Sequence, residues 1–398
     1  MNTNLVRQID RNVGPFVNIF LLSLKTLHAK LYRKKDINDI SIKNILIIKF
    51  FGMGSILLFS PTLQLIKEKY KNAKVTILTL TANEELCKML PSIDRILCLN
   101  MDSLFKFISL LSKHLKHIRK DGYDLIINLE FLTNFSTLIS LLSSIFLKNR
   151  IIIGFNSPFA WKNKINDINI AFGHGSHITK IFLKIANSLD IKADAVSFEN
   201  EKKALLEHGD KNYQALLIKK YPFLNHCNSW IVINVNAGEL CMHRRWPKQY
   251  FVTIIEALQK RTEAGIFLIG NENELGYTTE LINMLGDTVR IVNLCGQIKI
   301  DQLIDLLMKC KLFITNDSGL LHIATVMEVN TVSFFGPETP ALYGPIAGKH
   351  YVFYGDTYCS PCINIYNSKL SLCKDNICLT AISPKMVLKV LSEYFQLI

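Results

Sequence analysis

The segment Thr315-Asn-Asp-Ser-Gly-Leu-Leu-His322 is the strongest candidate for chemistry in the sequence. It follows an apolar run that is typical of a strand, and it leads into a predicted helix whose first amide groups have no partner within the helix. Ser318 and Gly319 could therefore offer backbone donors to a diphosphate, while Asp317 accepts hydrogen bonds from sugar hydroxyls. His322 lies one helical turn further on. Taken alone, the segment also fits an ordinary helix cap at Asp317 with a partly buried His322.

Two further segments place charged groups directly after predicted strands. Asn236 leaves one strand, and Arg244 and Arg245 follow a few residues later. Arginine donates two parallel hydrogen bonds, a geometry that suits phosphate. Glu274 follows the next strand, where a carboxylate could bind ribose hydroxyls. Simpler explanations are a solvated basic turn for the arginines and, for Glu274, an acid that stabilises the start of a helix.

Four cysteines cluster late in the chain, at Cys359, Cys362, Cys373 and Cys378. Their spacing permits a structural zinc ion, and reduced or disulfide-bonded thiols fit it as well. The other six cysteines are scattered singly through apolar or mixed segments, which is typical of reduced cytosolic thiols.

Strands and helices alternate along the chain, which predicts an α/β protein with two doubly wound parallel sheets. We expect ligands at the carboxyl ends of the strands, in a cleft that two Rossmann-like domains face. The predicted parts are an N-terminal helical segment (1–40), a first domain (41–205), a second domain (225–382) and a C-terminal helix (383–398). The predicted strands are 45–48, 75–80, 95–98, 124–128 and 151–154, then 230–235, 266–269, 289–293, 312–315 and 331–335.

The N-terminal segment is both basic and apolar. Its apolar run is shorter than the roughly 20 residues that a transmembrane helix needs, and no signal-peptide cleavage site follows it. Its apolar residues recur at helical spacing, so an amphipathic helix either lies in an anionic membrane interface or packs on the protein's own body. The apolar positions are Phe16, Phe20, Leu24, Leu27 and Leu31, and the flanking cations are Arg7, Arg11, Lys25, Lys30, Arg33, Lys34 and Lys35.

The 398-residue chain carries a formal net charge of +13, which favours an anionic partner. Nucleic acid, an acidic membrane surface and phosphorylated substrates all qualify. Because the sequence has no arginine-rich tract, zinc-finger spacing or aromatic-basic RNA-binding motif, we expect no nucleic-acid partner.

From about Ile45 onward the chain resembles glycosyltransferase family 9, the heptosyltransferases of the lipopolysaccharide inner core. The resemblance implies a GT-B fold and an inverting, metal-independent transfer from ADP-heptose. It also implies that Arg244 binds the donor diphosphate, that Glu274 binds ribose, and that the segment Asp317–His322 holds donor phosphate and sugar. The matching motifs are Lys49-Phe-Phe-Gly-Met-Gly-Ser through Pro61, Arg244-Arg-Trp-Pro247, Thr315 through His322, Phe335-Gly-Pro337 and the late cysteines.

One position departs from the family. The heptosyltransferases have an aspartate after the glycine turn that acts as general base, whereas this chain has Ser55. A serine cannot take a proton unaided near neutral pH. Glu130, which follows the strand 124–128 at the same sheet edge, is the candidate replacement, and a solvated loop acid is the alternative. His177 is a further acceptor-side candidate.

The sequence therefore predicts a cytoplasmic glycosyltransferase that is either free in the cytoplasm or peripheral on the inner face of the cytoplasmic membrane. Its second domain would bind a nucleotide sugar, and its first domain would present a lipopolysaccharide core or another lipid-linked glycan. No cofactor is expected beyond this donor, and Glu130, Ser55 and Asp317 are the predicted catalytic residues. The alternatives are a non-catalytic nucleotide-sugar or glycan-binding protein of the same fold, and a sugar-nucleotide epimerase.

Overall fold

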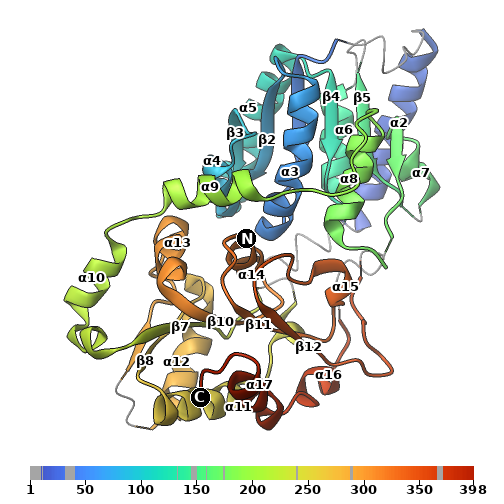
Figure 1. Ribbon diagram of the computed structural model, residues 1–398. Coiled ribbons are helices and arrows are strands. Elements are labelled where there is room, and N and C mark those ends of the chain that lie inside the picture. The colour runs from blue at the N-terminus through green and yellow to red at the C-terminus, as the bar shows by residue number, and fades with distance from the viewer. Residues whose placement is uncertain are drawn as a thin grey trace. The chain divides into compact units, whose positions relative to one another are not determined.

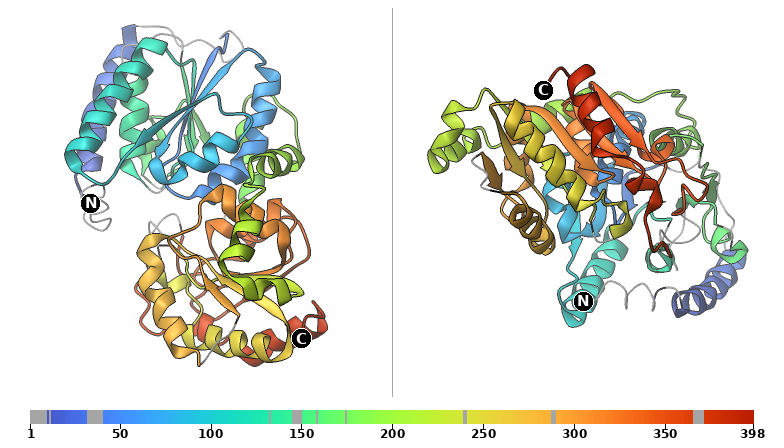
Figure 2. Two further views of the ribbon diagram at one scale, coloured as in Figure 1. Left: turned by 90° about the vertical axis from the view of Figure 1, so that its left-hand side faces the viewer. Right: turned by 90° about the horizontal axis from the view of Figure 1, so that it is seen from below.

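The chain forms two compact units, Met1–Ser197 and Phe198–Ile398. Each unit contains one six-stranded parallel sheet with helices on both faces (Figures 1 and 2). The predicted pair of doubly wound α/β sheets is therefore confirmed. The computed structural model describes residues 10, 12–31, 41–131, 133–144, 150–157, 159–173, 175–238, 241–286, 290–364 and 371–398, with the backbone alone for residues 24, 25 and 27–31.

The first sheet has the strand order β3-β2-β1-β4-β5-β6. Its central strands are short, apolar and buried, as expected for parallel strands that are covered on both faces. The edge strand β6 was not predicted, because three residues with an exposed polar centre carry too little periodicity. The strands are β1 (Asn44–Ile48), β2 (Lys74–Leu80), β3 (Arg95–Leu99), β4 (Leu125–Asn128), β5 (Ile151–Phe155) and β6 (Ile168–Ile170).

The helices of the first unit pack in two groups, α3 against α8, and α6 against both α2 and α5. Helix α3 begins at Met53, whereas the preference of proline for the first turn of a helix would favour a start at Pro61. Proline removes one helical hydrogen bond, but the helix is buried from Ile56 to Leu63, and this packing outweighs the loss. The helices are α2 (Gly14–Leu31), α3 (Met53–Lys69), η2 (Thr81–Asn83), α4 (Glu84–Met89), α5 (Leu104–Asp121), α6 (Asn134–Ser144), α7 (Ala160–Asn163) and α8 (Ile178–Asn187).

The second sheet has the order β12-β11-β10-β7-β8-β9, which repeats the order of the first sheet. In both sheets the direction of winding reverses between the first and fourth strands of the unit, β1 and β4 in one, β7 and β10 in the other. Ligands of open α/β sheets bind at such switch points. The strands are β7 (Ser229–Asn234), β8 (Ala264–Leu268), β9 (Ile291–Asn293), β10 (Cys310–Asn316), β11 (Thr331–Phe335) and β12 (His350–Tyr354).

The stretch between the two predicted domains, residues 206–224, contains the end of helix α9, all of helix α10 and the start of η3, and it belongs to the second unit. Helices α9 and α10 both pack on α13, where the Asp305 carboxylate accepts a hydrogen bond from the Gln214 amide at 2.8 Å. The helices are α9 (Glu199–His208), α10 (Tyr213–Lys220), η3 (Pro222–His226), η4 (Met242–Arg244), α11 (Lys248–Arg261), η5 (Glu272–Glu274), α12 (Leu275–Met284), α13 (Ile300–Lys309), α14 (Gly319–Val326), α15 (Pro340–Tyr343), α16 (Ile377–Thr380) and α17 (Pro384–Glu393).

The N-terminal segment contains the helix that its spacing predicts, α2. Leu24, Leu27, Leu31 and the flanking cations, from Arg7 to Lys35, lie outside the residues whose side chains the structure describes. Among the described residues, no helix combines the length and apolar character that crossing a bilayer requires.

Candidate functional site

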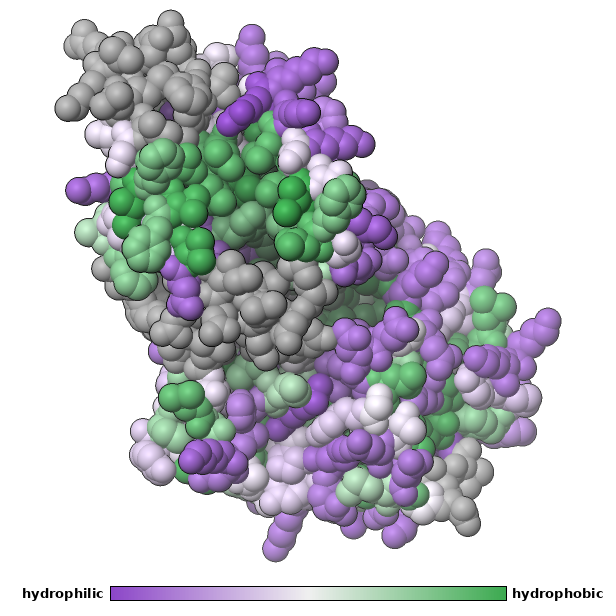
Figure 3. Space-filling model, turned by 180° about the vertical axis from the view of Figure 1, so that it is seen from behind, coloured by the Kyte–Doolittle hydropathy of each residue, from purple (hydrophilic) through white to green (hydrophobic). Residues whose placement is uncertain are grey.

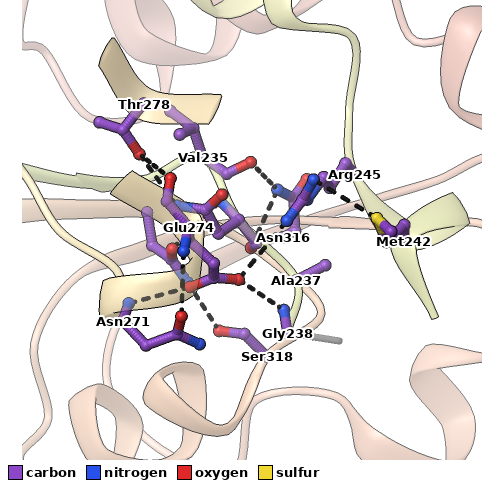
Figure 4. Close-up of polar contacts among 12 residues, drawn as sticks. Val235, Ala237, Gly238, Met242, Arg245, Asn271, Glu274, Thr278, Asn316 and Ser318 are labelled. Carbon is purple, nitrogen blue, oxygen red and sulfur yellow. Dashed lines mark hydrogen bonds and ion pairs between the residues drawn. The ribbon is translucent and has the colours of Figure 1, made fainter. Parts of the chain in front are cut away.

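The switch point of the second sheet is held together by asparagine side chains at the strand ends. Asn316, the last residue of β10, is fully buried. Its Nδ2 donates to the carbonyls of Val235 (3.0 Å) and Asn236 (3.2 Å), and its Oδ1 accepts from the Trp246 amide (2.8 Å) (Figure 4). One side chain thus fixes the loop after β7 and the start of the segment before α11. The sequence analysis did not assign a role to Asn316, although an amide that ends a buried strand was the available signal.

A second asparagine, Asn234, ends β7 in the same way. Its Nδ2 donates to the hydroxyls of Ser318 (3.2 Å) and Thr315 (3.3 Å), and its Oδ1 accepts from the Asn236 amide (3.1 Å). Asn236 in turn donates to the Thr278 hydroxyl at 3.2 Å. Buried hydrogen bonds therefore connect the loops after β7 and β10. A buried polar network whose members are satisfied makes the segments that it joins rigid.

Arg244 and Asp317 form an ion pair at this switch point. Arg244 Nη1 lies 3.1 Å from Asp317 Oδ2, and Nη2 donates to the Ala237 carbonyl at 2.7 Å. Only 12% of the Arg244 side chain and 6% of the Asp317 side chain are exposed. Burial alone would lower the pKa of the Arg244 guanidinium, but the adjacent Asp317 carboxylate raises that pKa above its ordinary value. The guanidinium is thus held in its charged form against Asp317, the residue that precedes Ser318.

Helix α14 begins directly after this ion pair. Ser318 is the N-cap residue with extended backbone, yet its side chain does not cap the helix. The Leu321 amide donates to the Ser318 carbonyl at 3.2 Å, which leaves the amides of Gly319 and Leu320 at the start of α14 for an anion, and the helix dipole favours an anion there. His322 lies one turn further on, buried, with its ring centroid 6.5 Å from that of Tyr343.

Glu274 joins the loops after β7 and β8. Its Oε1 accepts from the Gly238 amide and its Oε2 from the Asn271 amide, both at 3.0 Å (Figure 4). Arg245 Nη2 lies 3.7 Å from Oε1, and the Arg245 guanidinium stacks over the Tyr277 ring at 4.3 Å. Glu274 also completes a capping box with Asn271, so its carboxylate stabilises a helix start as the simpler explanation expects, in addition to its contacts with Gly238 and Arg245.

Glycine is required at Gly270, where β8 runs into this junction. A Cβ atom there would lie 2.6 Å from Asn236 Nδ2 and 2.8 Å from Cys295 Sγ, closer than real side chains approach. The close approach lets Asn236 reach Thr278, and Glu274 reach Gly238, across the two loops. The structure therefore places most of the predicted donor-side residues around the ends of β7, β8 and β10, with His322 one turn into α14: Asn236, Arg244, Arg245, Glu274, Asp317, Ser318 and Gly319.

The switch point of the first sheet contains a buried pair, Lys49 and Glu130. Glu130 Oε1 accepts from the amides of Phe50 and Phe51, both at 2.8 Å, and Lys49 Nζ lies 3.5 Å away. The Lys49 side chain is 2% exposed and the Glu130 side chain is 0% exposed. The alternative of a solvated loop acid is therefore wrong for Glu130, because its carboxylate fixes the glycine turn after β1.

Ser55 lies on the same turn. Its amide donates to the Gly52 carbonyl at 2.9 Å, and Gly52 has a φ of 88°, a left-handed conformation that favours glycine. Glu130 thus binds the first residues of the turn, Phe50 and Phe51, and Ser55 binds its later residue, Gly52. His177 is instead the N-cap residue of α8, where its Nδ1 accepts from the Thr179 amide at 3.4 Å.

The late cysteines are free thiols, as are the other six. Within the described ranges, which omit residues 365–370, no three His, Cys, Asp or Glu side chains are grouped so that they could hold a metal ion. Burial raises the pKa of the Cys378 thiol to about 11, which favours its protonated form. The zinc hypothesis for Cys359, Cys362, Cys373 and Cys378 is therefore not confirmed.

Comparisons with known proteins agree with this fold. The family model described as glycosyltransferase family 9 (heptosyltransferase) matches residues 111–372. Lipooligosaccharide heptosyltransferase 2 of Campylobacter jejuni is 27% identical over 345 residues, which cover 86% of this chain and 96% of the relative. The solved Escherichia coli ADP-heptose lipopolysaccharide heptosyltransferase II has a TM-score of 0.66 at 17% identity, with 89% of this chain and 98% of that chain covered. TibC, a dodecameric iron-containing heptosyltransferase from enterotoxigenic E. coli, has a TM-score of 0.54 at 11% identity, with 90% and 77% covered.

Proposed function

Because the chain belongs to glycosyltransferase family 9, the heptosyltransferases, we propose that it transfers heptose from ADP-heptose to a lipopolysaccharide core acceptor. The second unit binds the donor, and the first unit contributes the base that activates the acceptor hydroxyl. The acceptor oxygen attacks the anomeric carbon as the bond to the diphosphate breaks, and ADP leaves with the electron pair. The anomeric centre is inverted.

The observation that carries this proposal is the fixed cation beside the open end of α14. Arg244 is held by Asp317 at 3.1 Å, and the amides from Gly319 onward follow directly. A departing diphosphate gains negative charge as the bond to the sugar breaks, so a preorganised guanidinium and helix amides stabilise it more in the transition state than in the bound donor. We propose on this ground that the transfer needs no metal at the reacting carbon.

The remaining donor-side residues surround the expected nucleoside. Glu274 and Asn236 lie where the loops after β7 and β8 meet. Asn236 Oδ1 is buried and has no hydrogen-bond partner among the described atoms, so it is an acceptor that a ribose hydroxyl could satisfy. We assign the ribose to Glu274 and Asn236, the diphosphate to Arg244, Arg245 and the α14 amides, and the sugar hydroxyls to Asp317 and His322.

On the acceptor side we propose that Glu130 replaces the aspartate that the family has at the position of Ser55. Its support is the place of Glu130 on the glycine turn and the state of its two oxygens. Oε1 is engaged by two backbone amides, whereas Oε2 has no hydrogen-bond partner within the described part of the chain. Because the side chain is enclosed, the turn has to move when the acceptor binds.

Two further points are proposals of the same kind. The enzyme acts in the cytoplasm, at the inner face of the cytoplasmic membrane, where a lipid-linked acceptor and a cytoplasmic nucleotide sugar meet. A zinc ion at the late cysteines is a separate prediction, which metal analysis of the purified protein tests. The iron of TibC is a property of that protein.

The donor assignment is tested with the Asp317→Ala variant. Transfer from radiolabelled ADP-heptose to a core acceptor that lacks this heptose should fall by about 100-fold or more in kcat/KM, because Arg244 loses the partner that orients it. Asp356→Ala, which removes an exposed aspartate of the same unit, is the matched control and should leave the rate unchanged. Undiminished transfer by the folded Asp317→Ala protein would remove the assignment.

A further inference from the structure

Helix α2 is fixed to the body of the first unit. The Asp10 carboxylate accepts from the amides of Asn134 (2.8 Å) and Phe135 (2.6 Å), which begin α6. Asn18, fully buried on α2, donates to the Asn134 carbonyl at 2.9 Å. A Cβ atom at Gly14 would lie 2.7 Å from Asn134 Cβ, so the two helices pack at close range. One face of α2 is therefore already occupied by the protein itself.

The opposite face of α2 is apolar as well. Val13, Phe16, Val17 and Phe20 recur at helical spacing and are 52%, 75%, 38% and 65% exposed. A helix on the surface of a soluble domain ordinarily presents polar residues on its outer face. The outer row of α2 is thus an apolar surface that the described part of the chain leaves uncovered.

Helix α5 continues this surface on the other side of α6. Leu104, Phe105 and Ile108 are 59%, 81% and 52% exposed, although other residues of the same helix fill the core. Because α6 packs against both α2 and α5, the two apolar rows border one layer of helices. Figure 3 shows green apolar side chains gathered on this side of the first unit.

The same surface is basic. On α5 the exposed row that starts with Phe105 and Ile108 continues at helical spacing to Lys116 and Arg119. No acid occurs from Leu104 to Lys120, and within residues 1–35 Asp10, engaged by α6, is the single acidic residue. The other exposed cations of α5 are Lys106, Lys113 and Lys120.

We propose that the outer faces of α2 and α5 dock the first unit on an anionic lipid bilayer. Phe16, Phe20 and Phe105 enter the boundary between headgroups and acyl chains, while the cations of α5 contact lipid phosphates. A second copy of the chain fits this surface less well, since a twofold interface would place the basic residues of both copies against each other. The proposal deepens the proposed function, on which it rests for the acceptor, because a core carried by a lipid lies at such a surface.

The test is sedimentation of the purified full chain with vesicles. Vesicles of phosphatidylglycerol mixed with phosphatidylcholine should bind the wild type, and binding should weaken with added salt and with vesicles of phosphatidylcholine alone. The variant Phe16→Ser/Phe20→Ser should bind at least about tenfold more weakly, and Phe105→Ser should show a smaller loss in the same direction. Leu216→Ser, which changes a residue of the second unit that is 54% exposed, is the matched control and should bind as the wild type does.

Several results would overturn the docking surface. They are absence of wild-type binding, equal binding by the Phe16→Ser/Phe20→Ser protein, and a wild-type dimer that this variant converts to a monomer without any binding to vesicles. An assay on a deacylated, water-soluble core acceptor separates docking from catalysis, because the variant should keep the wild-type rate there. If no acceptor is glycosylated while vesicle binding still depends on Phe16 and Phe20, docking stands and the transferase function fails.

Discussion

The switch points of the two sheets contain the same kind of pair in different surroundings. In the first unit Lys49 lies 3.5 Å from Glu130, and in the second unit Arg244 lies 3.1 Å from Asp317. Both acids follow the fourth strand of their unit. The Glu130 side chain is fully enclosed and its Oε1 accepts two backbone amides, whereas Arg244 is partly exposed beside the open start of α14.

This difference separates two uses of one arrangement. Lys49 neutralises an acid that shapes a turn, so little positive charge remains for a ligand. Arg244 is a planar cation with several donors, and Asp317 and the Ala237 carbonyl engage only part of them. We propose on this ground that the second unit binds the anionic leaving group, and that Glu130 of the first unit uses its second oxygen, Oε2, as the proton acceptor.

The largest expected effect concerns the acid of the first unit. Glu130→Gln keeps the size of the side chain and removes its basicity, so kcat should fall by about 10²- to 10⁴-fold. Steady-state transfer with saturating ADP-heptose measures this loss.

A rescue experiment then distinguishes a base from a residue that only holds the turn. Adding Ser55→Asp to the Glu130→Gln protein restores a carboxylate to the turn and should recover part of the lost rate. A Glu130→Gln protein that turns over at the wild-type rate would contradict the role proposed for Glu130.

The next effect concerns the cation of the second unit. Arg244→Ala should lower kcat by about 10²- to 10³-fold, as expected when one preorganised donor to the developing charge is lost. Arg244→Lys keeps the charge without the planar fork and should recover only part of the rate. The comparison of the two switch points fails if both variants behave as the wild type does.

The strand-ending asparagines offer a matched pair for stability. Asn316→Ala frees two carbonyls and the Trp246 amide in a buried loop, so the free energy of unfolding should drop by about 3 kcal/mol. Asn128, which ends β4, accepts from the Glu130 amide and donates to the Ser136 hydroxyl, so Asn128→Ala should cost less, about 1–2 kcal/mol. Urea unfolding of both variants gives the difference, and a larger loss for Asn128→Ala would reverse the comparison.

The smallest expected effect concerns Trp246, the residue that follows Arg244 and Arg245 in the sequence. Trp246 is fully buried, stacks on Phe334 at 4.2 Å, and donates its indole N–H to the Ile382 carbonyl at 2.9 Å. Trp246→Phe keeps an aromatic ring but loses that donor, which should cost about 1–2 kcal/mol of stability and leave kcat nearly unchanged. A thermal melt together with a transfer assay checks both halves, and a loss of kcat with intact stability would give Trp246 a direct role.

The sequence predicted most of the sheet strands, because buried parallel strands are continuous apolar runs with strong β propensity. It did not predict β6 or β12, which are edge strands with polar flanks, nor the start of α3 at Met53, where burial outweighs the preference of Pro61 for the first turn of a helix. Helices α9 and α10 were also not predicted, since their polar sequence hides contacts to α13 that only the tertiary structure supplies.

The candidate site divides in the same way. Arg244, Glu274 and Asp317 could be named from the sequence because they follow strands and match family motifs. Asn234 and Asn316 were not given structural roles, since an asparagine that holds three segments has the same local pattern as one in an ordinary turn. The enclosure of Glu130 likewise depends on Phe50 and Phe51, which lie far from it in the sequence.

The central claim, that this chain moves heptose from donor to acceptor, is tested most directly by release of ADP from ADP-heptose with and without a lipopolysaccharide core acceptor. We predict that ADP release depends on the acceptor, that the transferred sugar has the inverted anomeric configuration, and that the Glu130→Gln and Arg244→Ala proteins each lose this activity. A wild-type protein that binds ADP-heptose but releases no ADP with any core acceptor would contradict the claim and identify a nucleotide-sugar-binding protein instead.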